Sequence, residues 1–360
     1  MKVLILGGTG AMGTPLQKHL LNLGYEVHVT SRSKHENGDV LFHCGDAHDT
    51  GFLEELLNES FDVIVDFMSY KTDEFATRAS ILCSNTEQYI FISSSRVYSK
   101  CEGMITEEHP RILDVCDDQD YLKTDEYALT KARQEDILRK SEYKNWTIVR
   151  PSLTYNSERL QYAIGEKEEW LYRYLHNEKI VFPRNMSDVI TTMSYGDDVA
   201  YAIAMLVGNE KALGEAVHIA GARPVTWEDV NRIYSDVLEE KCGRTPEYVY
   251  VDDWKRLSRD LGRYYQIKYA RSISRRFDNT KLENLIGRIN FTDSEEGLKA
   301  CLSQFLEGKR EFRKVSWKAE AYYNKITKDR LCVSEFGSKD RIKYLIGRYT
   351  PYFKMSGIKE

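Results

Sequence analysis

The chain begins with a short apolar run, Lys2–Leu6, that leads directly into the glycine-rich segment Gly7-Gly8-Thr9-Gly10-Ala11-Met12-Gly13. Apolar residues at helical spacing follow, so this segment lies between an expected strand and an expected helix. Glycines at such a place allow a tight turn, close approach of a phosphate to the backbone, and close packing of the helix on the strand. The N–H groups at the helix N-terminus then face the phosphates. We therefore expect a dinucleotide to bind at Gly7, Thr9, Gly10, Ala11, Met12 and Gly13.

Strand-like and helix-like segments alternate through the first 150 residues. Further strands are expected at 25–30, 40–43, 62–67, 88–93 and 146–149, and helices at 52–57, 72–83 and 124–140. This alternation predicts an α/β fold, with a doubly wound parallel Rossmann sheet and a smaller mixed α/β substrate domain at its carboxyl edge.

The expected domain boundaries follow from where the alternation stops. Residues 1–152 are expected to form the dinucleotide-binding core, and 193–221 to return to it; 153–192 and 222–307 form the substrate domain, and 308–360 a basic extension. Thr226–Asp229 and Thr292–Glu295 have the spacing of capping boxes that begin helices. Asp197 and Asp198 are expected to cap another helix.

The end of the second strand bears on the choice of cofactor. The sequence Thr30-Ser31-Arg32-Ser33-Lys34 has no carboxylate until Glu36. NAD-binding proteins usually hold the ribose hydroxyls with an acidic residue here, whereas Ser31 and Arg32 suit the 2′-phosphate of NADP. We expect NADP, with NAD as the other possibility; a solvated basic loop is the alternative interpretation.

The segment His43–Asp49 contains two histidines, a cysteine and two aspartates. Zinc needs three or four convergent ligands, and no partner pair stands out elsewhere in the sequence. The segment follows the third strand, so we expect a loop over the adenine and no metal.

A second set of residues can carry proton chemistry. Tyr127 and Lys131 are four residues apart within the expected helix 124–140, so their side chains share a face. A lysine ammonium beside a phenol lowers the pKa of the tyrosine, which makes it a general acid/base for a carbinol. Ser94 follows the strand 88–93, at the ligand side of such a sheet, where its hydroxyl can polarise a substrate oxygen.

These marks occur together in a known order. The chain resembles extended short-chain dehydrogenases/reductases of the NAD-dependent epimerase/dehydratase family over about residues 1–225. The resemblance rests on Gly7-x-x-Gly10-x-x-Gly13, Gly45-Asp46, Ser93-Ser94, Val97-Tyr98, Tyr127-x-x-x-Lys131, Arg150-Pro151 and Asp197-Asp198-Val199-Ala200.

The resemblance implies a role for each matching residue. Ser94 corresponds to the catalytic hydroxyl, Tyr127 to the acid/base and Lys131 to the residue that holds the nicotinamide ribose. Further cofactor contacts are implied at Asp46, Ala47, Met68, Ser93 and Pro151, and substrate contacts at Ser95, Arg96 and Tyr155. It also implies a nucleoside diphosphate-sugar as substrate, and a homodimer in which the helix 124–140 pairs with its symmetry mate. Met68-Ser69-Tyr70 departs from the small residues usual in the family, and Leu153 replaces the Asn of many sugar epimerases.

Alternative functions remain open at this point. The expected activity is that of an epimerase, dehydratase or reductase that works by reversible hydride transfer. One alternative is an NADPH-dependent reductase of a small ketone or aldehyde. The other is a non-catalytic dinucleotide-binding protein that binds RNA or a protein partner, which the aromatic and basic C-terminal segment favours.

The net charge of −5 conceals an asymmetry. Residues 308–360 hold 14 Lys and Arg against 6 Asp and Glu, a net of +8, while the rest of the chain carries −13. The favoured interpretation is packing against the acidic remainder, with Tyr322, Ile326 and Leu345, Tyr349 as helical pairs facing a core. Steering of an anionic substrate is the next interpretation. Nucleic acid and membrane surfaces are not expected partners.

The remaining features concern the cellular compartment. Seven scattered cysteines without a C-x-x-C pair argue against a disulfide framework and a structural zinc site. The sequence has no secretory signal pattern and no apolar run of about 18 residues. A cytoplasmic protein is therefore expected.

Overall fold

The structure, a computed structural model, describes residues 1–35, 38–330 and 336–350. It divides into two compact units. The first unit comprises Met1–Thr154, Thr192–Arg223 and Arg276–Thr292, and the second comprises Tyr155–Thr191, Pro224–Arg275 and Asp293–Glu360. Two boundaries differ from those expected: residues 276–292 belong to the first unit, and residues from 308 onward join the second. Cys332, Tyr352 and Phe353 lie outside the described residues.

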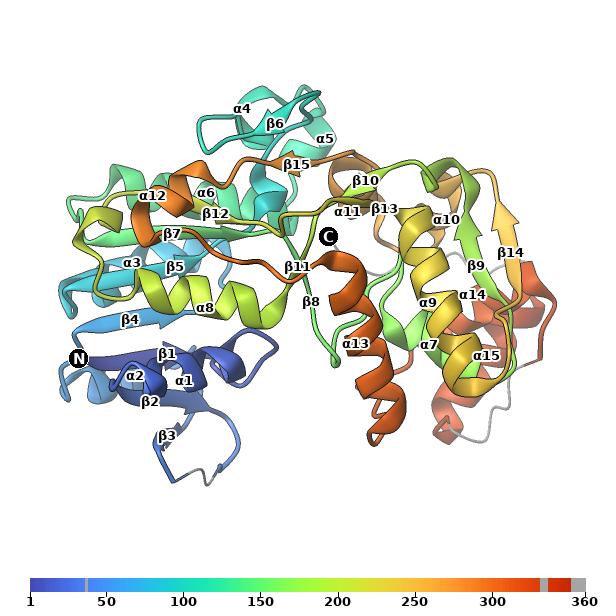
Figure 1. The fold of residues 1–360 in the computed structure, drawn as a ribbon, viewed down its shortest axis with the longest axis horizontal. Helices are drawn as coiled ribbons and strands as arrows, with labels where there is room; N and C mark the ends of the chain where they lie inside the picture. Colours follow the sequence, from blue (N-terminus) through green and yellow to red (C-terminus); the bar gives the residue numbers. More distant parts are fainter. Residues whose placement is uncertain (36–37, 331–335, 351–360) are drawn as a thin grey trace. The chain divides into compact units, whose positions relative to one another are not determined.

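The first unit contains a parallel sheet of seven strands in the order β12-β7-β5-β4-β1-β2-β3 (Figure 1). The strands are β1 (Lys2–Leu6), β2 (Glu26–Ser31), β3 (Val40–Cys44), β4 (Val63–Asp66), β5 (Gln88–Ile92), β7 (Trp146–Pro151) and β12 (Ala216–Ile219). The order reverses between β1 and β4, which is where ligands bind in doubly wound sheets. The predicted fold class is confirmed.

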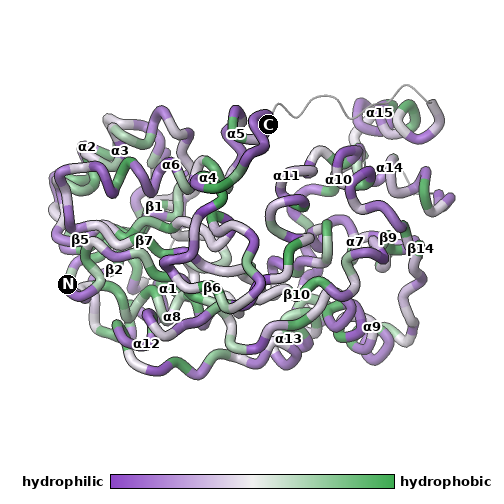
Figure 2. The backbone as a smooth tube through the Cα atoms, turned by 90° about the horizontal axis from the view of Figure 1, so that it is seen from above, coloured by the Kyte–Doolittle hydropathy of each residue, from purple (hydrophilic) through white to green (hydrophobic). Residues whose placement is uncertain are grey.

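Alternating residues of the strands bury the two faces of this sheet. Val3 and Ile5 pack with α1 (Gly13–Asn22), α8 (Gly196–Leu206) and α12 (Thr280–Ile286). Leu4 and Leu6 pack on the other face with α2 (Thr50–Leu57), α3 (Thr72–Ser84) and α6 (Tyr127–Lys140). Because both faces are covered, apolar residues predominate in the strands (Figure 2), although β2 contains His28 and Thr30 and β7 contains Arg150.

Short elements complete the first unit. They are η1 (Ser95–Val97), β6 (Met104–Ile105), α4 (Ile112–Val115), α5 (Gln119–Leu122), β11 (Met193–Tyr195), η3 (Glu210–Ala212) and β15 (Arg276–Phe277), with β8 (Leu153–Tyr155) at its boundary. The segment 193–221, which was expected to return to the core, contributes β12, which pairs with β7 in parallel.

The second unit is mainly helical. Its helices are α7 (Lys167–Leu175), α9 (Trp227–Cys242), α10 (Trp254–Asp260), α11 (Tyr264–Gln266), α13 (Ser294–Glu307), α14 (Trp317–Thr327) and α15 (Ser338–Tyr349), with the short helical turns η2 (Arg184–Met186) and η4 (Ile267–Arg271). Its strands are β9 (Ile180–Pro183), β10 (Ile190–Thr191), β13 (Val225–Thr226) and β14 (Tyr248–Val251). The capping box predicted at Thr226 is confirmed, since Thr226 and Asp229 exchange hydrogen bonds at the start of α9.

Two capping predictions are wrong. Asp293, not Thr292, caps α13, and its carboxylate accepts hydrogen bonds from the N–H groups of Glu295 and Glu296. Thr292 instead donates to the carboxylate of Asp198 at 2.7 and 3.1 Å. Asp197 and Asp198 lie in the first turn of α8, whose N-cap is Tyr195. The pairing of Asp198 with Thr292, 94 residues away, explains why local spacing misled.

The described part of the basic C-terminal segment packs within the second unit. Ala321 and Tyr344 join Tyr172 of α7 in one apolar cluster. Arg173 of α7 donates to Glu320 of α14 at 2.6 Å, with both side chains buried. The expected pair Leu345 and Tyr349 is wrong, because these residues are 44% and 65% exposed, and α15 buries Tyr344 instead.

No helix among the described residues is both long enough and apolar enough to cross a membrane.

Candidate active site

The glycine loop between β1 and α1 has the geometry that its sequence requires. Gly7 adopts a φ of 69°, and its N–H donates to the Thr30 hydroxyl at 3.0 Å. A Cβ at Gly13 would lie 2.3 Å from the carbonyl oxygen of Gly8, so only glycine lets the helix approach the loop. A Cβ at Gly10 would meet nothing within 4 Å, so space lies open at this glycine.

The N-terminus of α1 is suited to bind an anion. Met12 occupies the N-cap position without a side-chain hydrogen bond to the helix, and the first turn contains no acidic residue. The positive end of the helix dipole is therefore not neutralised by a carboxylate of that turn. Together with the open space at Gly10, this end of α1 fits the phosphates of a dinucleotide.

The ends of the neighbouring strands carry the other expected cofactor residues. Ser31 is buried and its hydroxyl accepts from the N–H of Ser33 at 3.2 Å, while Arg32 is exposed. After β3, Asp46 is exposed and Ala47 is buried. Met68, after β4, lies against the glycine loop, since its sulfur is 2.9 Å from the position of a Cβ at Gly7. The last residue of β7 is Pro151.

The catalytic candidates come from two elements that pack together, η1 and α6. Tyr127 is the first residue of α6, which begins three residues later than expected because Glu126 caps it by accepting from the Ala128 N–H. The Tyr127 side chain is 41% exposed, whereas Lys131, one turn later, is buried. The Lys131 Nζ lies 6.0 Å from the Tyr127 ring centre and 4.4 Å from that of Phe91 in β5.

Ser94 lies directly after β5, at the start of η1. Its hydroxyl accepts from the N–H of Arg96 at 3.2 Å, and its side chain is half-buried. Ser95 is buried beside it. Because Ser94 follows β5, this segment sits at the carboxyl end of that strand, where the packing of α6 on η1 brings Tyr127 and Lys131.

Burial controls the charge of Lys131. Removal from water lowers the pKa of its ammonium to about 8, against the opposing influence of Asp66 and Glu135. Asp66 is itself buried at the end of β4, where burial raises the pKa of its carboxyl. It accepts from the Met68 N–H and from the Tyr89 hydroxyl, both at 2.8 Å. Lys131 is therefore the titratable cation nearest to Tyr127 on its own helix.

Arg96 forms part of the surroundings of Tyr127. Its guanidinium lies 5.2 Å from the Tyr127 ring centre and pairs with the carboxylate of Glu126. Tyr121 also donates to Glu126 at 3.0 Å. Glu126 thus caps α6 and holds Arg96 over the phenol ring.

Comparison with known proteins agrees with this arrangement. Residues 3–220 match the model of the NAD dependent epimerase/dehydratase family. The chain belongs to this family.

The relatives found include plant and bacterial proteins. The chain is 28% identical over 263 residues to the chloroplast stem-loop binding protein of 41 kDa b of Arabidopsis thaliana, a match that covers 68% of this chain and 64% of the relative. Among solved structures, UDP-glucuronic acid 4-epimerase from Bacillus cereus, in complex with UDP-glucuronic acid and NAD, has a TM-score of 0.63 and 17% identity over 85% of this chain and 99% of the other. For dTDP-glucose 4,6-dehydratase from Bacillus anthracis with NAD, the values are 0.65 and 16% over 87% and 99%. At these identities the two structures establish likeness of fold.

Sequence reasoning missed a buried ion pair beside the candidate site. The Glu135 carboxylate in α6 accepts from Arg150 at 2.8 and 2.6 Å and from the Ser93 hydroxyl at 2.7 Å. It therefore joins α6 to the ends of β5 and β7. Glu135 and Arg150 are both almost wholly buried. An arginine inside an otherwise apolar strand was the available signal, because such a charge requires a buried partner.

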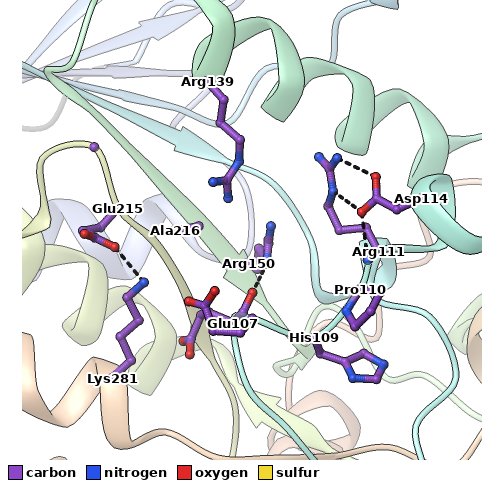
Figure 3. Close-up of a pocket in the computed structure, with 12 residues that line it drawn as sticks. Glu107, His109, Pro110, Arg111, Asp114, Arg139, Arg150, Glu215, Ala216 and Lys281 are labelled. Atoms are coloured by element: carbon purple, nitrogen blue, oxygen red, sulfur yellow. Dashed lines mark hydrogen bonds and ion pairs between the residues drawn. The ribbon is translucent and has the colours of Figure 1, made fainter.

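A polar cavity of about 310 Å³, with Arg150 among its lining residues, was not predicted (Figure 3). The ion pair between Lys281 and Glu215, at 2.7 Å, and that between Arg111 and Asp114, at 2.8 Å, lie in its lining. Most of its charges are thus compensated. None of the expected cofactor or substrate residues lines it.

Tyr155, expected to contact substrate, is fully buried and falls in the second unit. Of the expected site residues, the structure brings Ser94, Tyr127 and Lys131 together through the packing of η1 on α6, and the glycine loop follows β1 at the same edge of the sheet.

Proposed function

We propose that the protein catalyses reversible hydride transfer at a sugar hydroxyl of a nucleoside diphosphate-sugar, with NADP as cofactor. The observation that carries the proposal is the position of Tyr127. Its ring is accessible to a ligand at the N-terminus of α6, with the Lys131 ammonium buried one turn below and the Ser94 segment packed alongside.

Each side chain has a defined part in the oxidation of a carbinol to a carbonyl. The Ser94 hydroxyl donates a hydrogen bond to the substrate oxygen, and the Tyr127 phenolate accepts the proton from that oxygen. The charges of Lys131 and Arg96 stabilise the phenolate before the transfer. When bound, the nicotinamide supplies the acceptor of the hydride that leaves the carbinol carbon, and it returns the hydride in the reverse reaction.

The cofactor would be held along the carboxyl ends of β1 to β5 and β7. The pyrophosphate suits the glycine loop, and Arg32 suits the 2′-phosphate because its guanidinium is exposed beside β2. Asp46 and Ala47 would contact the adenine, and Met68, Ser93, Lys131 and Pro151 the nicotinamide riboside.

The substrate class rests on family membership and on the fold. The printed names of two solved structures of like fold mention UDP-glucuronic acid and dTDP-glucose. The proposal includes a homodimer in which α6 pairs with a second copy of itself. Although α6 packs against α3, partly exposed residues remain on it for such an interface.

The decisive experiment is Tyr127→Phe, assayed with a panel of UDP- and dTDP-sugars by product NMR and by NADPH absorbance. We expect a loss of about 10²–10⁴-fold in kcat, because general acid/base catalysis is removed. NADP affinity should stay unchanged. Tyr201→Phe, which alters another exposed tyrosine of the first unit, should retain full activity. Wild-type kcat in Tyr127→Phe would refute the proposal.

A second candidate function is RNA binding. Two observations support it: the name of the Arabidopsis relative and one surface of the second unit. Trp254 and Tyr264 stack with ring centres 6.2 Å apart, and Arg259 and Lys268 lie 4.3 and 5.7 Å from the Tyr264 ring centre. Stacked aromatics among cations bind bases and phosphates. Anisotropy titration of a labelled stem-loop RNA tests this: Trp254→Ala should weaken binding, and Tyr127→Phe should not. Equal binding by both variants would exclude this surface.

A further inference from the structure

A group of potential metal ligands lies in the first unit, in β2, in β3 and after α2. His28 in β2, His43 in β3 and Glu59 after α2 place their ligand atoms within 4.8 Å of one another. The Nδ1 atom of His28 is 2.8 Å from the Nε2 atom of His43. A Glu59 carboxylate oxygen is 3.8 Å from His28 Nδ1. Glu59 lies just before β4, near the amino ends of the strands, whereas the glycine loop follows the carboxyl end of β1.

The surroundings of His28 prepare one of its nitrogens for a metal. The Glu26 carboxylate lies 2.7 Å from His28 Nε2, so that nitrogen carries the proton and donates to the carboxylate. The Nδ1 atom is then unprotonated and accepts a hydrogen bond from the Nε2–H of His43 at 2.8 Å. A metal ion between the two nitrogens would replace that proton. A carboxylate behind a ligating histidine is the usual outer shell of a zinc site. The His28 ring is also held rigidly, because it is buried and packs edge-on against Phe61 at 5.1 Å.

Two of the three distances among the ligand atoms are close to those around a tetrahedral ion, and all three are within 4.8 Å. With metal–ligand bonds of about 2.0–2.1 Å, neighbouring ligands of a tetrahedral zinc ion are roughly 3.3 Å apart. The nitrogen–nitrogen distance of 2.8 Å and the nitrogen–oxygen distance of 3.8 Å lie on either side of this value. Shifts of roughly half an ångström in each side chain would bring the ligands into place. Two imidazoles and a carboxylate form a ligand set that zinc prefers.

One interaction opposes metal binding. The Lys2 ammonium pairs with Glu59 at 3.2 Å and lies 4.7 Å from the Phe61 ring centre. It supplies a positive charge at the place where a metal ion would supply two. A bound ion would therefore displace Lys2 from one carboxylate oxygen. Removal of the Lys2 ammonium should then strengthen zinc binding, whereas removal of a ligand should weaken it.

We propose that His28, His43 and Glu59 bind one zinc ion, with Glu26 orienting His28 and water in the fourth coordination position. The ion would join β2, β3 and the segment after α2 at one edge of the sheet. Because β3 is the edge strand and its histidine is a ligand, the site would stabilise the sheet edge and take no part in hydride transfer.

The test is calorimetric titration of the chelator-treated full-length protein with zinc sulfate. We expect one ion bound per chain, and His43→Ala should weaken the binding by more than about 100-fold, since it removes a ligand. Glu26→Gln should weaken it by about 10–100-fold, as expected for an outer-shell partner. Lys2→Met should strengthen it, because the competing ammonium is lost. Far-UV circular dichroism of each variant shows whether it is folded.

Two controls separate this site from fortuitous zinc binding. Cys44→Ser removes an exposed thiol next to His43; successive residues of a strand point to opposite faces, so Cys44 and His43 do not share one. His35→Ala removes an exposed histidine. Both should bind zinc as the wild type does. Absence of zinc binding by the wild type, loss of binding in Cys44→Ser, or unchanged binding in folded His43→Ala would each overturn the proposal.

Discussion

Replacement of Glu135 by alanine tests the buried ion pair that supports the candidate site. Glu135 is completely buried, and its carboxylate accepts two hydrogen bonds from Arg150, one from Ser93 and a longer one, of 3.5 Å, from Arg111. The change leaves Arg150, only 1% exposed, with a carbonyl contact at 3.4 Å to Glu107 and the face of the Tyr98 ring at 4.8 Å. Removal of one partner of a buried pair costs about 3–5 kcal/mol, because the other charge stays buried without compensation.

This magnitude is large compared with the stability of a typical domain, about 5–15 kcal/mol. For a domain of about 150–250 residues, each kcal/mol lowers Tm by roughly 2–4 °C, so Glu135→Ala should lower Tm by roughly 6–20 °C. Scanning calorimetry at neutral pH measures this shift in the transition of the first unit. Glu54→Ala, at an exposed position of α2, is the matched control and should change stability by less than about 0.5 kcal/mol.

The pH dependence supplies the refuting result. Burial acts to raise the pKa of Glu135, but the hydrogen bonds and charge of Arg150 outweigh it, and the pKa in the folded protein is lowered. A carboxyl with a lowered folded pKa stabilises the protein above its unfolded pKa, about 4.3, and this contribution is lost as the pH falls through the folded pKa. The Tm difference between wild type and Glu135→Ala should therefore narrow in acid. A difference that is small at pH 7, or that widens in acid, would refute the reasoning.

Three further predictions follow from the same structure. Because the Lys131 ammonium has a pKa lowered to about 8, the kcat of the proposed reaction should fall above that pH. In Lys131→Arg the fall in kcat should occur at higher pH, because a guanidinium keeps its charge, and a fall at the same pH would contradict the assignment. Arg32→Ala should reduce NADP affinity by about 10–150-fold and leave NAD affinity unchanged, as measured by fluorescence titration, whereas equal affinities for both cofactors in the wild type would contradict the NADP prediction. Truncation after Glu307 removes Glu320 from the buried Arg173 and should yield an aggregated or protease-sensitive second unit, so a monodisperse product with wild-type Tm by size exclusion and calorimetry would contradict a packing role.

The sequence by itself determined the parts of this protein whose geometry is local. Gly7 and Gly13 could be interpreted from their neighbours alone, because a left-handed turn and a close helix–strand approach each exclude a side chain. The strands of the sheet could be located because both faces are buried and most of their residues are apolar. The pair Tyr127 and Lys131 followed from helical spacing, although the N-cap at Glu126 set the first turn.

Only the tertiary structure decided which distant charges meet. Glu135 joins Arg150 and Ser93, Asp198 joins Thr292, and His28 joins His43, each across separate elements. The buried face of α15 likewise depends on its packing against α14. Nothing in the local sequence distinguishes Tyr344, which is buried, from Leu345, which is exposed. The physical reason is that burial and pairing depend on which segments the chain brings together, while spacing along the sequence records only the geometry of one element at a time.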